Sequence, residues 1–398
     1  MAKTAQAYQG PHWLSGGFRP FFLAGALAMA APVLIWLPFY FGDLTLPTAF
    51  APRDWHVHTL LFGGVPAIIA GFALTAVANW TGRPAVSGAE LLALLLLWCA
   101  GRVAVSISAL IGAPLAAAID LMFLISLSAV FAREVVAARN YRNLRVVGIV
   151  ALLALANLGF HAEAYSAGVA DYSLRAGLSL VLLLILVIGG RIIPAFTRNW
   201  LAARKAVKLP APFGKGDAVI MGVSALALAA WTILPLHLGT AALLLLAGAG
   251  NVWRLARWRG FATRQEPLLF ILHIAYGILC AGFLAVACSI LNPGHADPAA
   301  ALHLWTAGSV GLMTLAVMTR ASRGHSGQPL TASRMDLVLF GLILVGTFAR
   351  AAAPYLGEAM RPLLDVAGLA WAGGYLVFAA GYARWLLLPP AYLRMKAA

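Results

Sequence analysis

The sequence has few charged residues for its length. Only 10% of its 398 residues are Asp, Glu, Lys or Arg, whereas 62% are hydrophobic, and the mean hydropathy is +0.88. So little polar material cannot coat a globule in water, but a lipid bilayer requires no such coat. Long Ser-, Gln- or Glu-rich tracts are missing as well, which excludes extended disordered regions. Most of the chain is therefore expected to lie inside a membrane.

Cysteine is also scarce. The three cysteines, Cys99, Cys280 and Cys288, lie in apolar runs without metal-ligand spacing, so each is expected to pack as a small apolar residue. The CxxCH signature of covalent haem attachment is missing, and any haem would be held non-covalently. The sequence contains no P-loop, Rossmann fingerprint, nucleophile elbow or HExxH motif either. The common soluble enzyme classes defined by these motifs are excluded.

Apolar stretches long enough to cross a bilayer recur about twelve times. They predict an all-α, polytopic transmembrane bundle that forms a single integral membrane domain over residues 1–398. The expected helices cover residues 20–41, 54–78, 89–111, 115–138, 145–164, 172–195, 217–236, 238–258, 267–290, 297–320, 335–356 and 363–387. The weakest division lies near Pro235. The N-terminus, MAKTAQAYQG, does not resemble a cleavable signal peptide, so the first helix is expected to remain.

Basic residues are concentrated on one side of this predicted topology. With twelve spans, 23 of the 28 lysines and arginines fall in or beside the loops that share a side with both termini. The positive-inside rule places that side in the cytoplasm. Residues 1–19 and 388–398 are then short cytoplasmic segments. The asymmetry explains the net charge of +15 by membrane topology, without nucleic acid as a partner.

Histidines gather at two predicted depths. Four lie at the outer ends of the second, fifth and tenth helices: His56, His58, His161 and His303. Ionisable side chains at membrane depth are costly and usually have a partner or a ligand, and imidazoles from different helices can ligate haem iron or copper. The alternative is that each hydrogen bonds at the membrane interface. Since residues two apart point about 200° apart on a helix, His56 and His58 are expected to have different partners.

The histidines at the inner predicted depth and the arginines within the spans suggest further cofactor contacts. His273 begins the ninth predicted helix, and His325 is placed in the loop after the tenth; with Arg191 and Arg323 they would hold a second cofactor, such as a second haem, or form an ion-pair network. Arg102 and Arg350 lie in the outer halves of the third and eleventh helices and require anions. Haem propionates are one choice of anion, and protein carboxylates are the other. The outer carboxylates are Asp54, Asp120, Glu163 and Asp365.

Several segments together resemble the NnrS family of bacterial membrane proteins. They are Phe18-Arg19-Pro20-Phe21-Phe22, Trp55-His56-Val57-His58, Phe62-Gly63, Ala70-Gly71-Phe72-Ala73-Leu74-Thr75-Ala76-Val77, Asn79-Trp80-Thr81-Gly82, Gly190-Arg191-Ile192-Ile193-Pro194-Ala195-Phe196-Thr197, Ala301-Leu302-His303, and Arg320-Ala321-Ser322-Arg323-Gly324-His325-Ser326-Gly327. Each is a weak signal alone, but together they are specific and span nearly the whole chain.

The resemblance implies a haem- and copper-containing protein of nitric oxide metabolism, linked to nitrosative-stress resistance and denitrification. It implies haem b, copper, nitric oxide as a partner, and an electron donor such as quinol or a cytochrome. The implied metal ligands are His56, His58, His161, His273, His303 and His325. A departure is Thr59, where the family usually has Glu, and this puts ligand tuning or proton delivery in doubt. Nitric oxide reduction, a non-enzymatic haem or copper transporter, store or sensor, and a purely structural protein remain as alternatives.

Overall fold

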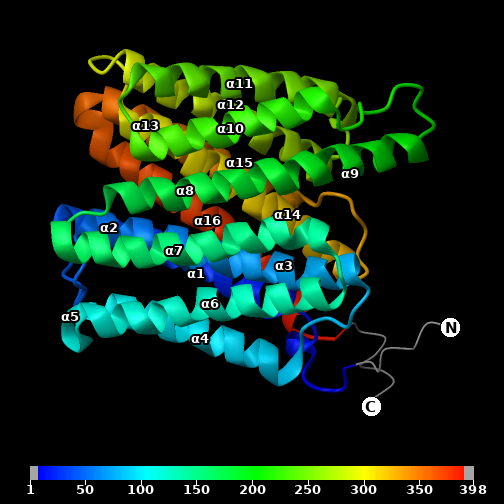
Figure 1. Ribbon diagram of the computed structural model, residues 1–398, viewed down its shortest axis with the longest axis horizontal. Helices are drawn as coiled ribbons and strands as arrows, with labels where there is room; N and C mark the ends of the chain where they lie inside the picture. The colour runs from blue at the N-terminus through cyan, green and yellow to red at the C-terminus, as the bar shows by residue number, and fades with distance from the viewer. Residues whose placement is uncertain (1–7, 390–398) are drawn as a thin grey trace. The chain divides into compact units, whose positions relative to one another are not determined.

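The computed structural model describes residues 8–389, and within this range every regular element is a helix (Figure 1). In chain order the longer elements are α1 (Phe18–Phe41), α2 (Pro52–His58), α3 (Val65–Thr81), α4 (Gly88–Ser106), α5 (Ser108–Ile111), α6 (Ala113–Ala137), α7 (Leu144–Ala167), α8 (Asp171–Leu184), α9 (Gly190–Ala203), α10 (Lys215–Ile233), α11 (Leu238–Arg257), α12 (Pro267–Leu291), α13 (Pro298–His303), α14 (Gly311–His325), α15 (Arg334–Ala352) and α16 (Met360–Leu387). The predicted all-α class is confirmed.

These helices form twelve segments that are long and apolar enough to cross a membrane, as the sequence predicted. Some segments join two helices: α2 continues into α3, α8 into α9 and α13 into α14. The uncertain division near Pro235 is confirmed, because α10 ends at Ile233 and α11 begins at Leu238. The chain is therefore a multi-pass membrane protein. The side on which its termini lie stays a prediction from the charge pattern.

Two predicted helix ends are wrong, for the same reason. The sixth span continues to Ala203, and the tenth continues to His325, which is the last residue of α14 and does not lie in a loop. Both extensions are polar, and a hydropathy criterion ends a helix where apolar character ends. Backbone hydrogen bonding continues past that point, because helices can extend from the apolar layer into the polar interface.

Contacts divide the chain into two compact units. Unit 1 comprises residues 1–177, 318–329 and 378–398, and unit 2 comprises residues 178–317 and 330–377. In unit 1, α1 packs on α3, α4 on α6, and α6 on both α3 and α7. In unit 2, α11 packs between α10 and α12, and the segment between α13 and α14 packs on α12 and α15. Each unit thus buries its own helical faces.

Three spans are interrupted by a π-helical segment. These segments are η2 (Thr59–Gly64), η4 (Ile185–Gly189) and η6 (Leu304–Val310). A π segment redirects the side chains around it and often occurs at functional sites. The first directly follows His58 and the third directly follows His303, so two of the histidines predicted to be ligands lie where their helix geometry changes.

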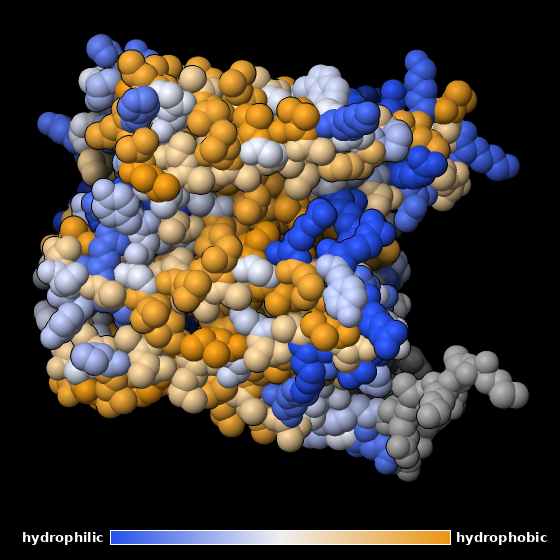
Figure 2. All heavy atoms as spheres, viewed as in Figure 1, coloured by the Kyte–Doolittle hydropathy of each residue, from blue (hydrophilic) through white to orange (hydrophobic). Residues whose placement is uncertain are grey.

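Large apolar side chains are exposed along the flanks of the spans, including Leu96 (59% exposed), Leu155 (62%) and Leu246 (63%). Figure 2 shows apolar atoms over the flanks of the helices, and hydrophilic atoms gathered mainly toward helix ends. Water would make such exposure unfavourable, whereas lipid tails solvate it. The exposed apolar surface and the apolar composition therefore both indicate that the protein lies in a bilayer.

Candidate metal centre

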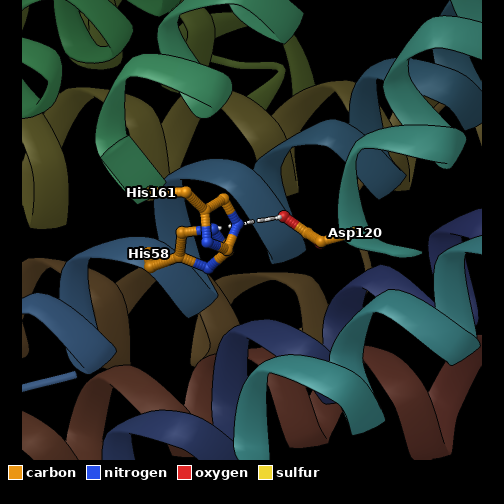
Figure 3. A group of neighbouring side chains, drawn as sticks. All are labelled: His58, Asp120 and His161. Atoms are coloured by element: carbon orange, nitrogen blue, oxygen red, sulfur yellow. Dashed lines mark hydrogen bonds and ion pairs between the residues drawn. The ribbon is translucent and has the colours of Figure 1, made fainter. Parts of the chain in front are cut away.

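Three helices of unit 1 bring His58, Asp120 and His161 to one point (Figure 3). His58 ends α2, Asp120 lies in α6 and His161 lies in α7. The Nε2 atoms of His58 and His161 lie 3.2 Å and 3.1 Å from the same carboxylate oxygen, Asp120 Oδ2. All three side chains are buried, with exposed fractions of 0%, 2% and 8% for His58, Asp120 and His161. The cluster is closed off from solvent.

The Asp120 carboxylate is the centre of this hydrogen-bonded cluster. Asn157 donates from Nδ2 to Asp120 Oδ2 over 2.8 Å, and its Oδ1 lies 2.9 Å from His58 Nε2. Arg102 Nη2 donates to the other carboxylate oxygen, Oδ1, in an ion pair. With neutral imidazoles, the carboxylate and the guanidinium cancel in charge. A buried ion pair with these additional hydrogen bonds is the arrangement that a low-dielectric interior tolerates.

Two glycines allow the helices of this cluster to approach closely. A Cβ atom at Gly101 of α4 would lie 2.8 Å from Asp120 Oδ1 and 3.1 Å from the Asp120 Cα. A Cβ at Gly63, in the π segment, would overlap the Arg102 guanidinium. Small residues at such positions let helices pack tightly inside membranes. The close packing of α4 on α6 explains how Arg102 reaches Asp120.

Aromatic rings surround the two imidazoles. The ring centroids of Phe50, Phe62 and Phe160 lie 5.1, 5.6 and 5.4 Å from that of His58. Phe50 also lies 5.4 Å from His161, and the two imidazoles are 4.7 Å apart at an interplanar angle of 66°. This apolar shell lowers the local dielectric and strengthens every polar contact inside it. It also makes the centre accessible to small uncharged molecules more readily than to ions.

The donor atoms of this cluster fit one metal ion. Two imidazole nitrogens and one carboxylate oxygen all lie within 4.8 Å of one another. Metal–ligand bonds of about 2.0–2.2 Å place neighbouring donors roughly 3 Å apart, close to the N–O separations observed here. Without a metal, both Nε2 atoms face carboxylate or amide oxygens and therefore carry protons. Binding a metal through them would displace these protons from Nε2.

The buried Nδ1 atom of His58 has no hydrogen-bond partner among the described residues. In the metal-free tautomer this atom carries the lone pair, because Nε2 donates to oxygen. A metal that takes Nε2 would move the proton to Nδ1. The unused nitrogen is therefore consistent with a histidine whose tautomer changes on metal binding.

His56 does not join the cluster. Its ring stacks on Trp36 of α1 with centroids 4.2 Å apart and an interplanar angle of 28°. His56 and His58 thus have different partners, as their spacing predicted. The neighbouring Thr59 donates from Oγ1 to the backbone carbonyls of Trp55 and His56, so the carboxylate beside His58 comes from Asp120 and not from the position after His58.

His303 lies in unit 2, at the end of α13, and its ring is oriented by the backbone. Its Nδ1 lies 2.6 Å from the carbonyl oxygen of Ala299, so Nδ1 carries the proton and donates, and Nε2 carries the lone pair. A hydrogen bond of this kind is the usual support for a metal-ligating histidine. Arg350 lies on α15, which packs against α13. Unit 2 therefore brings His303 and Arg350 onto neighbouring helices.

The four residues predicted at the inner level are divided between the two units. His273 and Arg191 belong to unit 2, while His325 and Arg323 belong to unit 1. His273 Nε2 lies 2.8 Å from Thr197 Oγ1, and its buried Nδ1 has no hydrogen-bond partner among the described residues.

In unit 1, the His325 ring lies 5.2 Å from the Phe18 ring, and Arg323 donates from Nε to the Tyr382 hydroxyl over 3.0 Å. Outside these levels, His237 Nδ1 accepts from Gly239 N at the start of α11. His237 thus has the structural role of a helix cap.

Sequence reasoning assigned no ligand role to Asp120 and did not identify Asn157. Asp120 was considered as one of the outer carboxylates that could pair with an arginine, and it does pair with Arg102. The sequence does contain a signal for both residues. Asn157 and His161 are four residues apart and share a helix face. Asp120 is the only acidic residue in the apolar run from 113 to 133. Polar residues isolated in apolar runs mark sites inside membranes.

Fold and site together define a polytopic helical membrane protein with a buried cluster of two histidines and one carboxylate suited to a metal ion. The family described as NnrS protein matches residues 12–389 of the chain, which belongs to this family. It is therefore a membrane protein linked to nitric oxide metabolism. A comparison with curated proteins finds no match.

Proposed function

We propose that unit 1 holds a copper ion at His58, Asp120 and His161, and that nitric oxide meets the protein there. The convergence of two imidazole nitrogens and one carboxylate oxygen in a buried apolar shell is the observation that carries this proposal. Mixed nitrogen and oxygen sites favour Cu²⁺ among the divalent first-row metals. Once bound, copper would supply a redox-active centre able to coordinate nitric oxide.

The residues around the copper would orient the ligands and exclude water. Asp120 holds both imidazoles in place, and Arg102 neutralises the charge that the carboxylate would otherwise leave unpaired at membrane depth. The shell of Phe50, Phe62 and Phe160 favours an uncharged diatomic over water and ions. Nitric oxide is such a molecule and dissolves in lipid, so it requires no aqueous channel to reach the site.

A non-covalent haem b is proposed in unit 2, where His303 would ligate its iron. The hydrogen bond to Ala299 fixes the tautomer that iron requires, and Arg350 on the adjacent α15 would pair with a propionate. His56, His273 and His325 remain candidates for further haem contacts, together with Arg191 and Arg323.

Binding and sensing of nitric oxide suit the site better than rapid turnover. Reducing two nitric oxide molecules to nitrous oxide and water consumes two electrons and two protons, so the site would require a proton route and a donor such as quinol or a cytochrome. Asn157 and Arg102 are the polar side chains that contact the proposed ligand Asp120. Because both donate hydrogen bonds to its carboxylate, neither is available to deliver protons. The alternative function, storage or transport of copper or haem, requires no proton route.

We infer from the charge pattern that this centre lies at the outer side of a bacterial inner membrane. His58 lies near the start of the second span and His161 near the end of the fifth. Both positions are predicted to lie on the side opposite the basic loops. An outer position would expose the centre to nitric oxide arriving from the periplasm. Fusion of reporters to loops on each side would check this orientation.

Replacing His58 or His161 by alanine should lower the copper content of the purified protein at least about tenfold, because each substitution removes one of three protein ligands. Metal content is measured by mass spectrometry on the detergent-solubilised protein, and haem by the pyridine haemochrome. His237→Ala is the matched control, since it removes an imidazole that caps α11 and should leave copper unchanged.

The haem content of the His58 and His161 variants should stay near that of the unaltered protein, because the proposed haem ligand lies in the other unit. Retention of full copper content in both variants would contradict the assignment of the site. Loss of nitric oxide-induced spectral changes together with copper would support its role in binding the gas.

A further inference from the structure

Arg19, in the first turn of α1, is a buried guanidinium that pairs with no carboxylate of the described residues. It is only 7% exposed. Its Nε donates to Ser15 Oγ over 3.0 Å, and its Nη1 donates to the Trp385 carbonyl oxygen over 2.6 Å. Residues 1–7 and 390–398 contain no aspartate or glutamate. A buried charge that meets only neutral acceptors is expensive, so this position calls for an anion.

Polar atoms without hydrogen-bond partners among the described residues lie around Arg19. One is the buried Nε2 of His12. Burial, and then the nearby Arg19 charge, lower the pKa of His12 below its ordinary value, so this imidazole is neutral at neutral pH and can donate a hydrogen bond without adding charge. Another is the hydroxyl of Ser322, a residue that is 0% exposed. A fully buried hydroxyl without a partner commonly marks a missing ligand or water.

Ser322 lies in α14, the helix whose last residue, His325, contacts Phe18 at the start of α1. It is three residues from His325 and so shares a helix face with it. The His325 ring lies 5.2 Å from the Phe18 ring, and the Arg19 guanidinium carbon lies 4.6 Å from the same Phe18 ring. His12, Arg19 and Ser322 therefore belong to one region of unit 1.

A second guanidinium reaches the same region. Arg323 is 6% exposed and donates to the Tyr382 hydroxyl, and its guanidinium carbon lies 5.2 Å from the Trp385 ring. Arg19 binds the backbone carbonyl of the same tryptophan, so both guanidinium groups lie next to Trp385.

The region lies at the membrane interface. Arg19 begins the first span, Ser322 lies near the end of the tenth and Trp385 near the end of the twelfth, so all three are on the side of the membrane that holds the N-terminus. Tryptophans favour headgroup depth, and Trp13 and Trp385 are both half-buried here. Basic pockets between spans at this depth bind phospholipid headgroups.

We propose that Arg19, with His12, Ser322 and Arg323, binds the phosphate of an anionic phospholipid. The phosphate oxygens would accept hydrogen bonds from the guanidinium groups, for which their geometry is suited. They would also accept hydrogen bonds from the unpartnered imidazole and hydroxyl. The acyl chains would lie along the apolar flanks of the spans. This site is independent of the metal centre.

Native mass spectrometry of delipidated protein in detergent, titrated with phosphatidylglycerol, phosphatidylcholine or inorganic phosphate, tests the proposal. We expect phosphatidylglycerol to bind at least about tenfold more tightly than phosphatidylcholine. Arg19→Gln should weaken phosphatidylglycerol binding about tenfold or more, the loss typical of a charge-assisted hydrogen bond. Arg145→Gln is the control, because it removes an exposed arginine from the same side of unit 1, and it should change binding less than about twofold.

Ser322→Ala provides a second variant that keeps the fold, since it removes only a buried hydroxyl. It should weaken phosphatidylglycerol binding about fivefold, the loss of one hydrogen bond. Equal binding by the unaltered protein, Arg19→Gln and Ser322→Ala would overturn the site. Binding of inorganic phosphate that depends on Arg19, without any binding of phosphatidylglycerol, would overturn the lipid assignment in favour of free phosphate.

Discussion

Asp120→Ala should destabilise unit 1 by about 3–5 kcal/mol, the cost typical of leaving one partner of a buried ion pair unpaired, and should also abolish copper binding. The substitution leaves Arg102 without its carboxylate. It also removes the shared acceptor of His58, His161 and Asn157. Denaturant titration in detergent measures the free energy of unfolding, and metal analysis measures the copper.

A double substitution separates the stability effect from the ligand effect. Arg102→Met combined with Asp120→Asn removes both charges, so it should recover much of the lost free energy of unfolding but none of the copper. Asp54→Asn is the matched control, since Asp54 is also fully buried, pairs with Arg53 and accepts from Ala170 N. Copper retained in Asp120→Ala would exclude this carboxylate as a ligand.

Arg254→Ala should destabilise unit 2 by about 3–5 kcal/mol for the same reason, while copper in unit 1 is retained. Arg254 is 1% exposed. It donates to Asp217 over 3.2 Å, to Asn251 over 3.0 Å and to the Tyr276 hydroxyl over 2.9 Å. These contacts tie α10, α11 and α12 together through one side chain.

Arg257→Ala provides a matched comparison for Arg254→Ala. Arg257 binds the same carboxylate, Asp217, over 2.8 Å, but its side chain is 26% exposed. Its loss should reduce the free energy of unfolding by no more than about 1 kcal/mol, because partly exposed ion pairs contribute little. Equal effects of the two substitutions would indicate that burial does not determine the strength of this network.

The helical fold could be read from the sequence because apolar length alone specifies a membrane span. Spans such as α12 (Pro267–Leu291) agree with prediction to within a residue or two at each end. The π segments after His58 and His303 could not be foreseen, because they depend on backbone hydrogen bonding and no residue type requires them. The same limitation explains why the C-terminal ends of α9 and α14 were predicted too early in the sequence.

The candidate site was predictable only in part. The depth of His58 and His161 followed from counting spans, and the two do come together in the structure. Their carboxylate partner did not follow, because pairing between α6 and α7 depends on tertiary packing that one sequence does not specify. The prediction that His56 and His58 have different partners is confirmed, because it used only helical periodicity.

The nearest-neighbour shell of the bound metal, measured by X-ray absorption at the copper edge, tests the account most directly. We expect two imidazole nitrogens and at least one oxygen at about 2 Å from copper, with the imidazole signal reduced in His58→Ala and unchanged in His237→Ala. A copper shell containing sulfur, or an imidazole signal that His58→Ala leaves intact, would contradict it.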